Sequence, residues 1–187
     1  MQFAEMKWNA SQVTLVRGDN PCVESYEVWV PAQDSETAWQ ALASAGAQEV
    51  HEDALEMFRI VCGIPKFGQD IRERDLPQET AQERALNFTK GCYIGQEIVE
   101  RIRSRGAVHR TFVGFEIDGK VPPGTRIQSE GKDVGEITSV ATVNADGGER
   151  VIALGYIRKE FTLPGKELTA GDGKVRVAGL QFSGILA

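Results

Sequence analysis

The feature that most restricts the fold is the texture of the chain after Arg110, where short strand-like segments alternate with glycine and proline turns. Turn sequences such as Pro-Pro-Gly at residues 122–124 and Leu-Pro-Gly at 163–165 separate them. Strands at this spacing are typical of a small antiparallel barrel or sandwich. The expected strands span residues 111–117, 125–128, 134–143, 151–156, 167–170 and 174–181.

The N-terminal part mixes strands and helices. Alternating apolar residues predict strands over residues 12–17 and 23–30, and the turn sequence between them predicts a hairpin. Helical spacing predicts helices between Asp34 and Gly46, over 51–61 and over 94–103. In the first helix, Trp39 belongs to the apolar stripe and is expected in the core. Residues 63–91 are irregular, and such long loops often carry function. We expect an α+β fold with a domain boundary near residues 106–110.

Composition excludes several classes of protein. The chain has 187 residues, 41% of them hydrophobic, and a net charge of −6, which is ordinary for a globular protein and unlike disordered or collagenous chains. No apolar run approaches the roughly 20 residues that span a bilayer, and no signal peptide is evident, so we expect a cytoplasmic location without membrane contact. The cysteines, Cys22, Cys62 and Cys92, are odd in number and widely spaced, which argues against a disulfide framework or a stable metal site.

Charge is distributed unevenly. Residues 1–100 hold 8 basic and 17 acidic side chains, whereas four arginines fall within ten residues further on. One interpretation is a solvated helix end and loop; the other is an anion site for a polyglutamate tail, a phosphate or RNA. The arginines of this window are Arg101, Arg103, Arg105 and Arg110.

The stretch KGCYIGQE, residues 90–97, is the most informative for chemistry. The thiol of Cys92 follows Lys90 by two residues and precedes the helix expected from residue 94. An ammonium group and a helix N-terminus both favour the reactive thiolate. Gln96 and Glu97 fall in the first helical turn, where they can cap the helix or reach a ligand. The alternative is a buried, inert cysteine in a loop–helix corner.

A second pair of interest lies on the expected strand 23–30. Period-2 alternation places Glu27 and Trp29 on one face. A carboxylate beside an indole is unusual for a plain solvent face. The alternative interpretation of Glu27 is a surface carboxylate at a strand edge.

KGCYIGQE resembles the signature K-G-C-[FY]-x-G-Q-E of the YgfZ-type folate-binding proteins, which belong to the superfamily of the glycine-cleavage T-protein (GcvT), an aminomethyltransferase. Three shorter elements agree with this resemblance. Residues 59–65 resemble R-[IL]-E-x-G-x-P, residues 25–29 resemble G-Y-E-[IVL]-x, and residues 76–79 resemble L-P-x-E. Two departures are the Val-Cys pair after Arg59-Ile60, where the family has Glu-Ala, and Ser25 in place of glycine.

The resemblance implies a fold and a function. Residues 1–108 are expected to be the remainder of a GcvT-like folate-binding α+β domain that lacks an N-terminal part, and residues 109–187 a small antiparallel β-barrel. The implied function is a folate-binding accessory protein that supports assembly or repair of Fe–S clusters with tetrahydrofolate or a one-carbon derivative. Its partners would be Fe–S client enzymes or assembly proteins.

The resemblance also assigns roles to residues. Cys92 is implied to be the essential thiol, with Lys90 as its neighbour. Glu27 would bind the pterin and Trp29 would stack on it, because a carboxylate accepts two hydrogen bonds from an aminopyrimidine edge. Arg59 would meet the glutamate tail of folate or brace the pocket; its alternative is a helix-end salt bridge. The remaining residues expected at the folate site are Tyr93, Gln96 and Glu97.

Two alternative functions stay open. One is a true aminomethyltransferase of glycine cleavage, against which the cysteine-containing signature speaks by resemblance. The other is a binding module for tRNA or other RNA that uses the arginines of residues 101–110 and contributes to tRNA modification.

Overall fold

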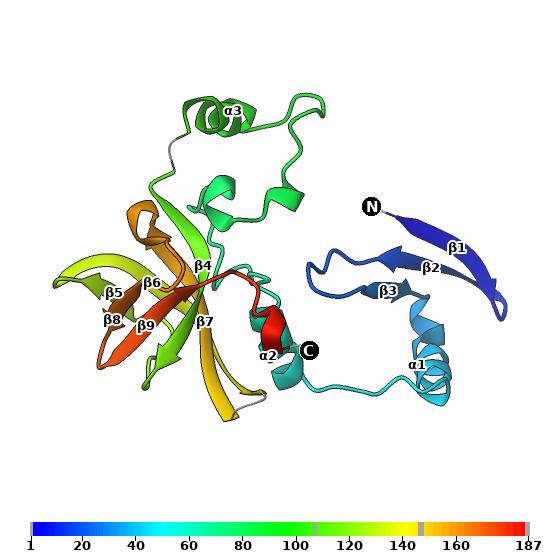
Figure 1. The fold of residues 1–187 in the computed structure, drawn as a ribbon. Coiled ribbons are helices and arrows are strands. Elements are labelled where there is room, and N and C mark those ends of the chain that lie inside the picture. The colour runs from blue at the N-terminus through cyan, green and yellow to red at the C-terminus, as the bar shows by residue number, and fades with distance from the viewer. Residues whose placement is uncertain (1, 107, 146–147, 186–187) are drawn as a thin grey trace. The chain divides into compact units, whose positions relative to one another are not determined.

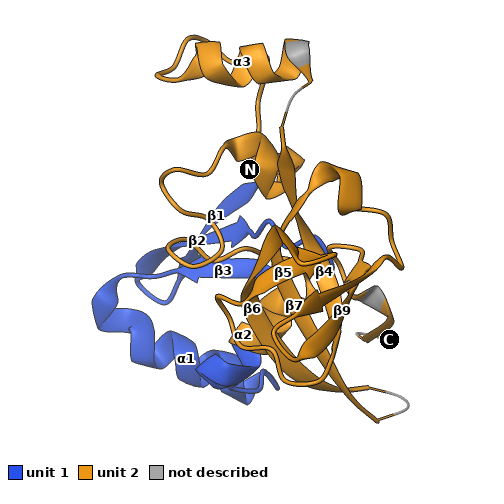
Figure 2. Cartoon of the chain, turned by 90° about the vertical axis from the view of Figure 1, so that its left-hand side faces the viewer, with its two compact units in different colours: residues 1–55 blue, residues 56–187 orange. Residues whose placement is uncertain are grey.

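The computed structural model describes residues 2–106, 108–145 and 148–185. The chain divides into two compact units, residues 1–55 and residues 56–187 (Figure 2). Within the described part, no helix has the length and apolar character needed to cross a membrane.

The first unit contains a three-stranded antiparallel sheet in the order β1-β2-β3, formed by Phe3–Trp8, Ser11–Arg17 and Tyr26–Trp29 (Figure 1). Strand β2 pairs with β3 with Leu15 opposite Val28, which confirms the predicted hairpin. Strand β1 was not predicted, although its sequence carries the pattern, since Ala4, Met6 and Trp8 alternate with charged residues.

The helix α1, Ser35–Ser44, follows a short 3-10 turn at Ala32–Asp34. An apolar cavity of about 260 Å³ lies between one sheet face and this helix, which contributes Ala38, Ala41 and Leu42 to its lining. The expected core position of Trp39 is wrong, because its side chain is 53% exposed. The small residues of α1 face the sheet, and Trp39 instead lines a second hollow with Ala43.

The second unit begins within α2, Glu52–Val61. An irregular segment follows, with 3-10 turns η2 at Pro77–Thr80 and η3 at Glu83–Ala85. The helix α3 spans Gln96–Arg105. It begins two residues later than predicted, because Gly95 adopts the left-handed conformation (φ 89°), which favours glycine, and serves as N-cap.

The rest of the second unit is a closed antiparallel barrel, which confirms the expected fold class and decides between barrel and sandwich. Its strands follow one another around the barrel in the order β4-β7-β6-β5-β8-β9. Short 3-10 turns lie at Lys159–Phe161 and Ser183–Ile185. The strands are β4 Arg110–Asp118, β5 Arg126–Ser129, β6 Lys132–Ala145, β7 Gly148–Arg158, β8 Glu167–Ala170 and β9 Gly173–Ala178.

Strand β7 is apolar on both faces because it separates two cores. Its residues Ala153 and Ile157 point into the barrel, with Phe115 of β4. Ile152, Leu154 and Tyr156 belong to a second cluster outside the barrel, together with residues of α2 and Phe182. A strand buried on both sides reads as a continuous apolar run, as residues 151–157 do. The outer cluster fixes α2 against the barrel.

The barrel wall leaves no room for a side chain at Gly155. A Cβ atom there would lie 2.2 Å from the backbone oxygen of Glu136. We predict that Gly155→Ala lowers the free energy of unfolding of the second unit by about 1–3 kcal/mol, since overpacking forces the backbone to shift. Urea unfolding measures this, with Gly184→Ala as control because nothing lies within 4 Å of its added Cβ. Equal stability of both variants would contradict the prediction.

Candidate functional site

The KGCYIGQE motif lies in the loop before α3 and in its first turn. Cys92 is exposed, which excludes the buried arrangement. The ammonium of Lys90 lies 4.5 Å from the ring centroid of Tyr93, a cation–π contact. Gln96 is the first helical residue, and Glu97 is the acidic residue of the first turn, where the helix dipole favours a carboxylate. The motif therefore presents a solvent-accessible thiol; its catalytic role stays a prediction.

Residues 83–106, which we call the α3 arm, extend away from the barrel (Figure 1). One contact between the arm and the rest of its unit is made by Gln78, whose Nε2 donates to the carbonyl oxygen of Val99 at 3.0 Å. Within the arm, the guanidinium of Arg103 lies 4.4 Å from the ring centroid of Phe88. These contacts help to hold α3, which begins four residues after Cys92.

Two of the described arginines of the basic window, Arg103 and Arg110, are paired with acidic side chains. Arg101 and Arg103 are exposed on α3, and Arg103 lies 3.5 Å from Glu100. The side chain of Arg105 lies outside the described residues. Arg110 belongs to β4 and binds acidic side chains of its own unit. RNA contact through this window receives no support from the arrangement.

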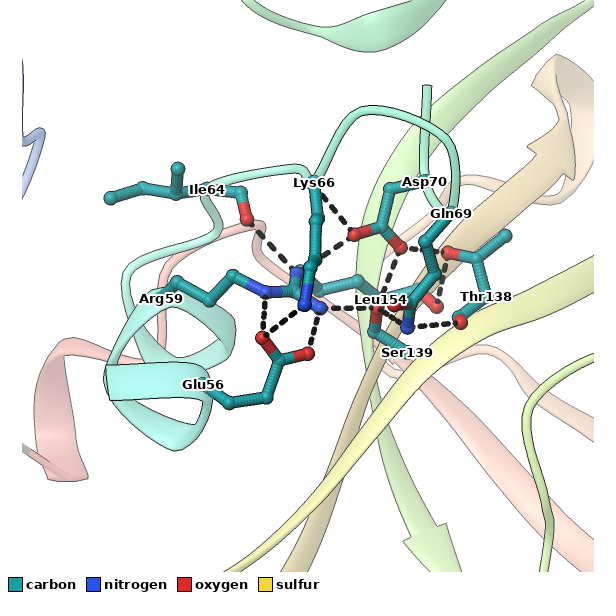
Figure 3. Close-up of polar contacts among 9 residues, drawn as sticks. All are labelled: Glu56, Arg59, Ile64, Lys66, Gln69, Asp70, Thr138, Ser139 and Leu154. Carbon is teal, nitrogen blue, oxygen red and sulfur yellow. Dashed lines mark hydrogen bonds and ion pairs between the residues drawn. The ribbon is translucent and has the colours of Figure 1, made fainter. Parts of the chain in front are cut away.

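Arg59, on the last turn of α2, is at the centre of a buried polar network (Figure 3). Its Nε and Nη2 donate to the carboxylate of Glu56, and Nη2 also donates to Ser139 Oγ at 2.9 Å. Its Nη1 donates to Ile64 O at 3.1 Å and to Asp70 Oδ2 at 2.8 Å. The side chain is only 12% exposed. The guanidinium thus braces the end of α2 against the loop and the barrel.

Asp70 receives hydrogen bonds from a β-bulge in strand β6. The pairing of β6 with β7 shifts between Ile137 and Ser139, so that Thr138 is the extra residue. As a result two consecutive hydroxyls, Thr138 Oγ1 and Ser139 Oγ, both donate to Asp70 Oδ1, the second at 2.7 Å. The backbone amide of Lys66 donates to Asp70 Oδ2 at 2.9 Å. These bonds compensate the burial of a carboxylate that has no exposed surface.

The charges of this network stabilise one another. Burial opposes the charge of Arg59, but the hydrogen bond to Glu56 and the nearby Asp70 outweigh it and hold the pKa of Arg59 above its ordinary value. The hydrogen bond from Arg59 lowers the pKa of Glu56 against the effect of burial. The expected folate-tail contact of Arg59 stays a prediction, and it would compete with these internal bonds.

A second ionic cluster lies at the base of the α3 arm and was not predicted. Arg110 donates from Nη2 to Asp75 Oδ1 at 2.7 Å and from Nε to Glu79 Oε2 at 2.9 Å. Its guanidinium carbon lies 4.5 Å from the ring centroid of Tyr156. Burial, and then Asp75, raises the pKa of Tyr156 far above its ordinary range. The sequence signal was the L-P-x-E element, which contains Glu79.

The first unit holds the remaining expected site residues. On strand β3, Trp29 Nε1 donates to Glu27 Oε2 at 2.9 Å. Both residues are exposed, and the bond confirms that they share a face. Their binding roles stay predictions. Among the described residues, no group of three His, Cys, Asp or Glu side chains is arranged to hold a metal ion.

The barrel and its surroundings match known proteins. Residues 110–180 match the family model "Glycine cleavage T-protein C-terminal barrel domain". The chain is 31% identical over 147 residues to the aminomethyltransferase of Thermosynechococcus vestitus, covering 78% of this chain and 39% of that one. It is 28% identical over 136 residues to a putative chloroplastic transferase of Arabidopsis thaliana, covering 73% of this chain and 31% of the relative.

The fold also resembles that of a solved structure, the glycine cleavage system aminomethyltransferase T from Bartonella henselae. The TM-score is 0.79 at 20% identity, over 92% of this chain and 50% of that chain. The chain therefore spans half or less of the length of these relatives. Residues 110–180 are thus similar to the C-terminal barrel of the glycine-cleavage T-protein, and the relatives matched over most of this chain are an aminomethyltransferase and a putative transferase. These matches do not show whether the chain is of the YgfZ type.

The Arg59–Asp70 pair gives a stability prediction. In Asp70→Asn a buried guanidinium loses its fully buried partner charge, so we expect a loss of about 3–5 kcal/mol in the free energy of unfolding of the second unit. The control is Arg176→Gln, whose side chain is 57% exposed and pairs with Glu116; its loss should stay below about 1 kcal/mol. Urea unfolding compares the two. Similar losses of stability in the two variants would contradict a larger contribution from the buried ion pair than from the exposed one.

Glu56 gives a pH prediction. Its pKa is lowered in the folded state from 4.5, so its contribution to stability is present above that value and is lost as pH falls through the folded pKa. We expect the stability difference between the wild type and Glu56→Gln to be constant at neutral pH and to shrink below about pH 4.5. Urea unfolding from pH 7 to 3 measures it. A stability difference that grows as the pH falls would contradict a lowered pKa of Glu56 in the folded state.

Proposed function

We propose that this chain takes part in tetrahydrofolate-dependent one-carbon chemistry of the aminomethyltransferase kind. The observation that carries the proposal is its likeness to the aminomethyltransferase of Thermosynechococcus vestitus over 78% of this chain. The match of residues 110–180 to the family model of the C-terminal barrel domain adds further support. Because the chain spans less than half of that relative, the proposal concerns binding first and transfer second.

The Glu27–Trp29 pair fits the pterin end of a folate. Trp29 donates to one carboxylate oxygen of Glu27, while Oε1 has no hydrogen-bond partner in the described part of the chain. A carboxylate oriented in this way can accept hydrogen bonds from an aminopyrimidine edge, and the exposed indole offers a ring for stacking. Tetrahydrofolate would supply the acceptor for a one-carbon unit. Glu27 and Trp29 would bind and orient it.

A second candidate function is the accessory role in assembly or repair of Fe–S clusters, and one observation favours it. Cys92 is an exposed thiol four residues before the start of α3, within the KGCYIGQE stretch that resembles the YgfZ signature. An accessible thiol near a helix N-terminus is suited to nucleophilic or ligand chemistry. Under this proposal Lys90, Tyr93, Gln96 and Glu97 would surround the thiol and the bound folate.

Folate binding is tested by titration calorimetry with tetrahydrofolate under anaerobic conditions. We predict that Glu27→Gln weakens binding at least tenfold, because an amide replaces one acceptor oxygen by a donor. Glu24→Gln is the matched control, since Glu24 is also exposed in the first unit and pairs with Arg17. Equal affinity of both variants and the wild type would remove Glu27 from the site, and no binding by the wild type would contradict folate binding by this chain.

The two candidate functions are separated by Cys92→Ser. Transfer chemistry of the aminomethyltransferase kind predicts that this variant still forms methylene-tetrahydrofolate from an aminomethyl-lipoyl carrier. The Fe–S role predicts that no methylene-tetrahydrofolate forms with the wild type, and that restoration of a client enzyme's cluster depends on Cys92.

A further inference from the structure

The base of the α3 arm is closed by side chains that the proposed function does not use. Residues 76–79 precede the arm, and both polar side chains of this element form hydrogen bonds at its base. Gln78 donates to the backbone of α3 at Val99, and Glu79 accepts a hydrogen bond from Arg110 Nε. Arg110, the first residue of β4, lies just beyond the arm's other end.

Arg110 joins the two ends of the arm. It stands 35 residues after Asp75 and 31 residues after Glu79, and it bonds to both. The two carboxylates are shielded from water, since their side chains are only 2% and 10% exposed. Pinning the ends of a segment of this length removes much of its conformational freedom. One ionic cluster thereby holds both the segment that enters the arm and the strand that leaves it.

The cluster rests on a fixed surface. The guanidinium of Arg110 stacks on Tyr156, whose ring centroid lies 5.2 Å from that of Phe112 in the outer core. Asp75 is fixed as well, because its Oδ2 accepts the backbone amide of Arg72 at 2.8 Å. A planar guanidinium can lie flat on an aromatic ring while the N–H groups of its edge reach two carboxylates, a geometry that the compact ammonium of lysine does not reproduce. The geometry of the cluster therefore favours arginine over lysine.

We propose that Arg110 is a positioning residue that closes the base of the α3 arm and so fixes where Cys92 and the start of α3 stand relative to the barrel. The importance of this placement rests on the proposed function, in which Cys92 takes part. The closure of the arm's base by Arg110 does not depend on the proposed function, and it is measured without folate or any client enzyme.

The test is the distance between spin labels on Cys92 and on the barrel, by pulsed electron paramagnetic resonance of the full chain. The second label is placed by Lys132→Cys on β6, in a Cys22→Ser background that leaves Cys62 buried. We expect a narrow distance distribution that becomes at least twofold broader in Arg110→Gln. Arg110→Lys should lie between, because it keeps the charge and loses the fork.

Two controls keep the outcome decisive. Arg176→Gln removes an arginine from another ion pair of the barrel and should leave the distribution unchanged. Hydrogen exchange should accelerate in α3 and stay constant in β6, whereas a general loss of stability would accelerate both. If Arg110→Gln does not fold, the double variant Asp75→Asn, Glu79→Gln opens the same cluster from its other side. Distributions as narrow as that of the wild type in the folded variants would overturn the proposal.

Discussion

The second unit depends on one buried ion pair, that of Arg59 with Asp70. A carboxylate without exposed surface is costly unless charge and hydrogen bonds compensate it. Arg59 supplies the charge, and the bulge in β6 supplies two hydroxyls on one side of the strand, Thr138 and Ser139. The pair therefore joins the end of α2, the loop that carries Asp70 and the bulged part of strand β6 to one another. An apolar contact in its place would fix none of these directions.

The two arginine clusters of this unit, around Arg59 and Arg110, have different structural roles. The five N–H groups of Arg59 all bond within the chain, which favours its bracing role over contact with a folate tail. Arg110 acts at the other end of the irregular segment, where it bonds to Asp75 and Glu79. Between these clusters in the sequence the chain forms the α3 arm, which carries the exposed Cys92. The arm is therefore held at its base and carries a thiol that is exposed to solvent.

The barrel could be predicted from the sequence because its information is local: alternation and turn residues recur in each strand. The polar networks could not, since their partners are far apart in the chain. Asp70 reads as an ordinary loop acid, and Thr138 and Ser139 read as strand residues until a bulge turns both toward it. Trp39 was misplaced because apolar spacing identifies a helical stripe but not which part of it meets the sheet. The Glu27–Trp29 pair was found because strand period alone brings the two together.

Motif residues can hold a fold or present chemistry, and their hydrogen-bonding capacity tells the two apart. A side chain whose donors and acceptors are all used internally binds a ligand only by losing those bonds, at a cost of about 1–3 kcal/mol for each buried group left unpaired. By this criterion the elements at residues 59–65 and 76–79 are braces, because Arg59 and Glu79 are engaged inside the chain. The exposed carboxylate of Glu27 and thiol of Cys92 retain capacity for a ligand. Under the proposed function, ligand binding is therefore assigned to strand β3 and the α3 arm, whereas Arg59 and Arg110 serve to hold the fold.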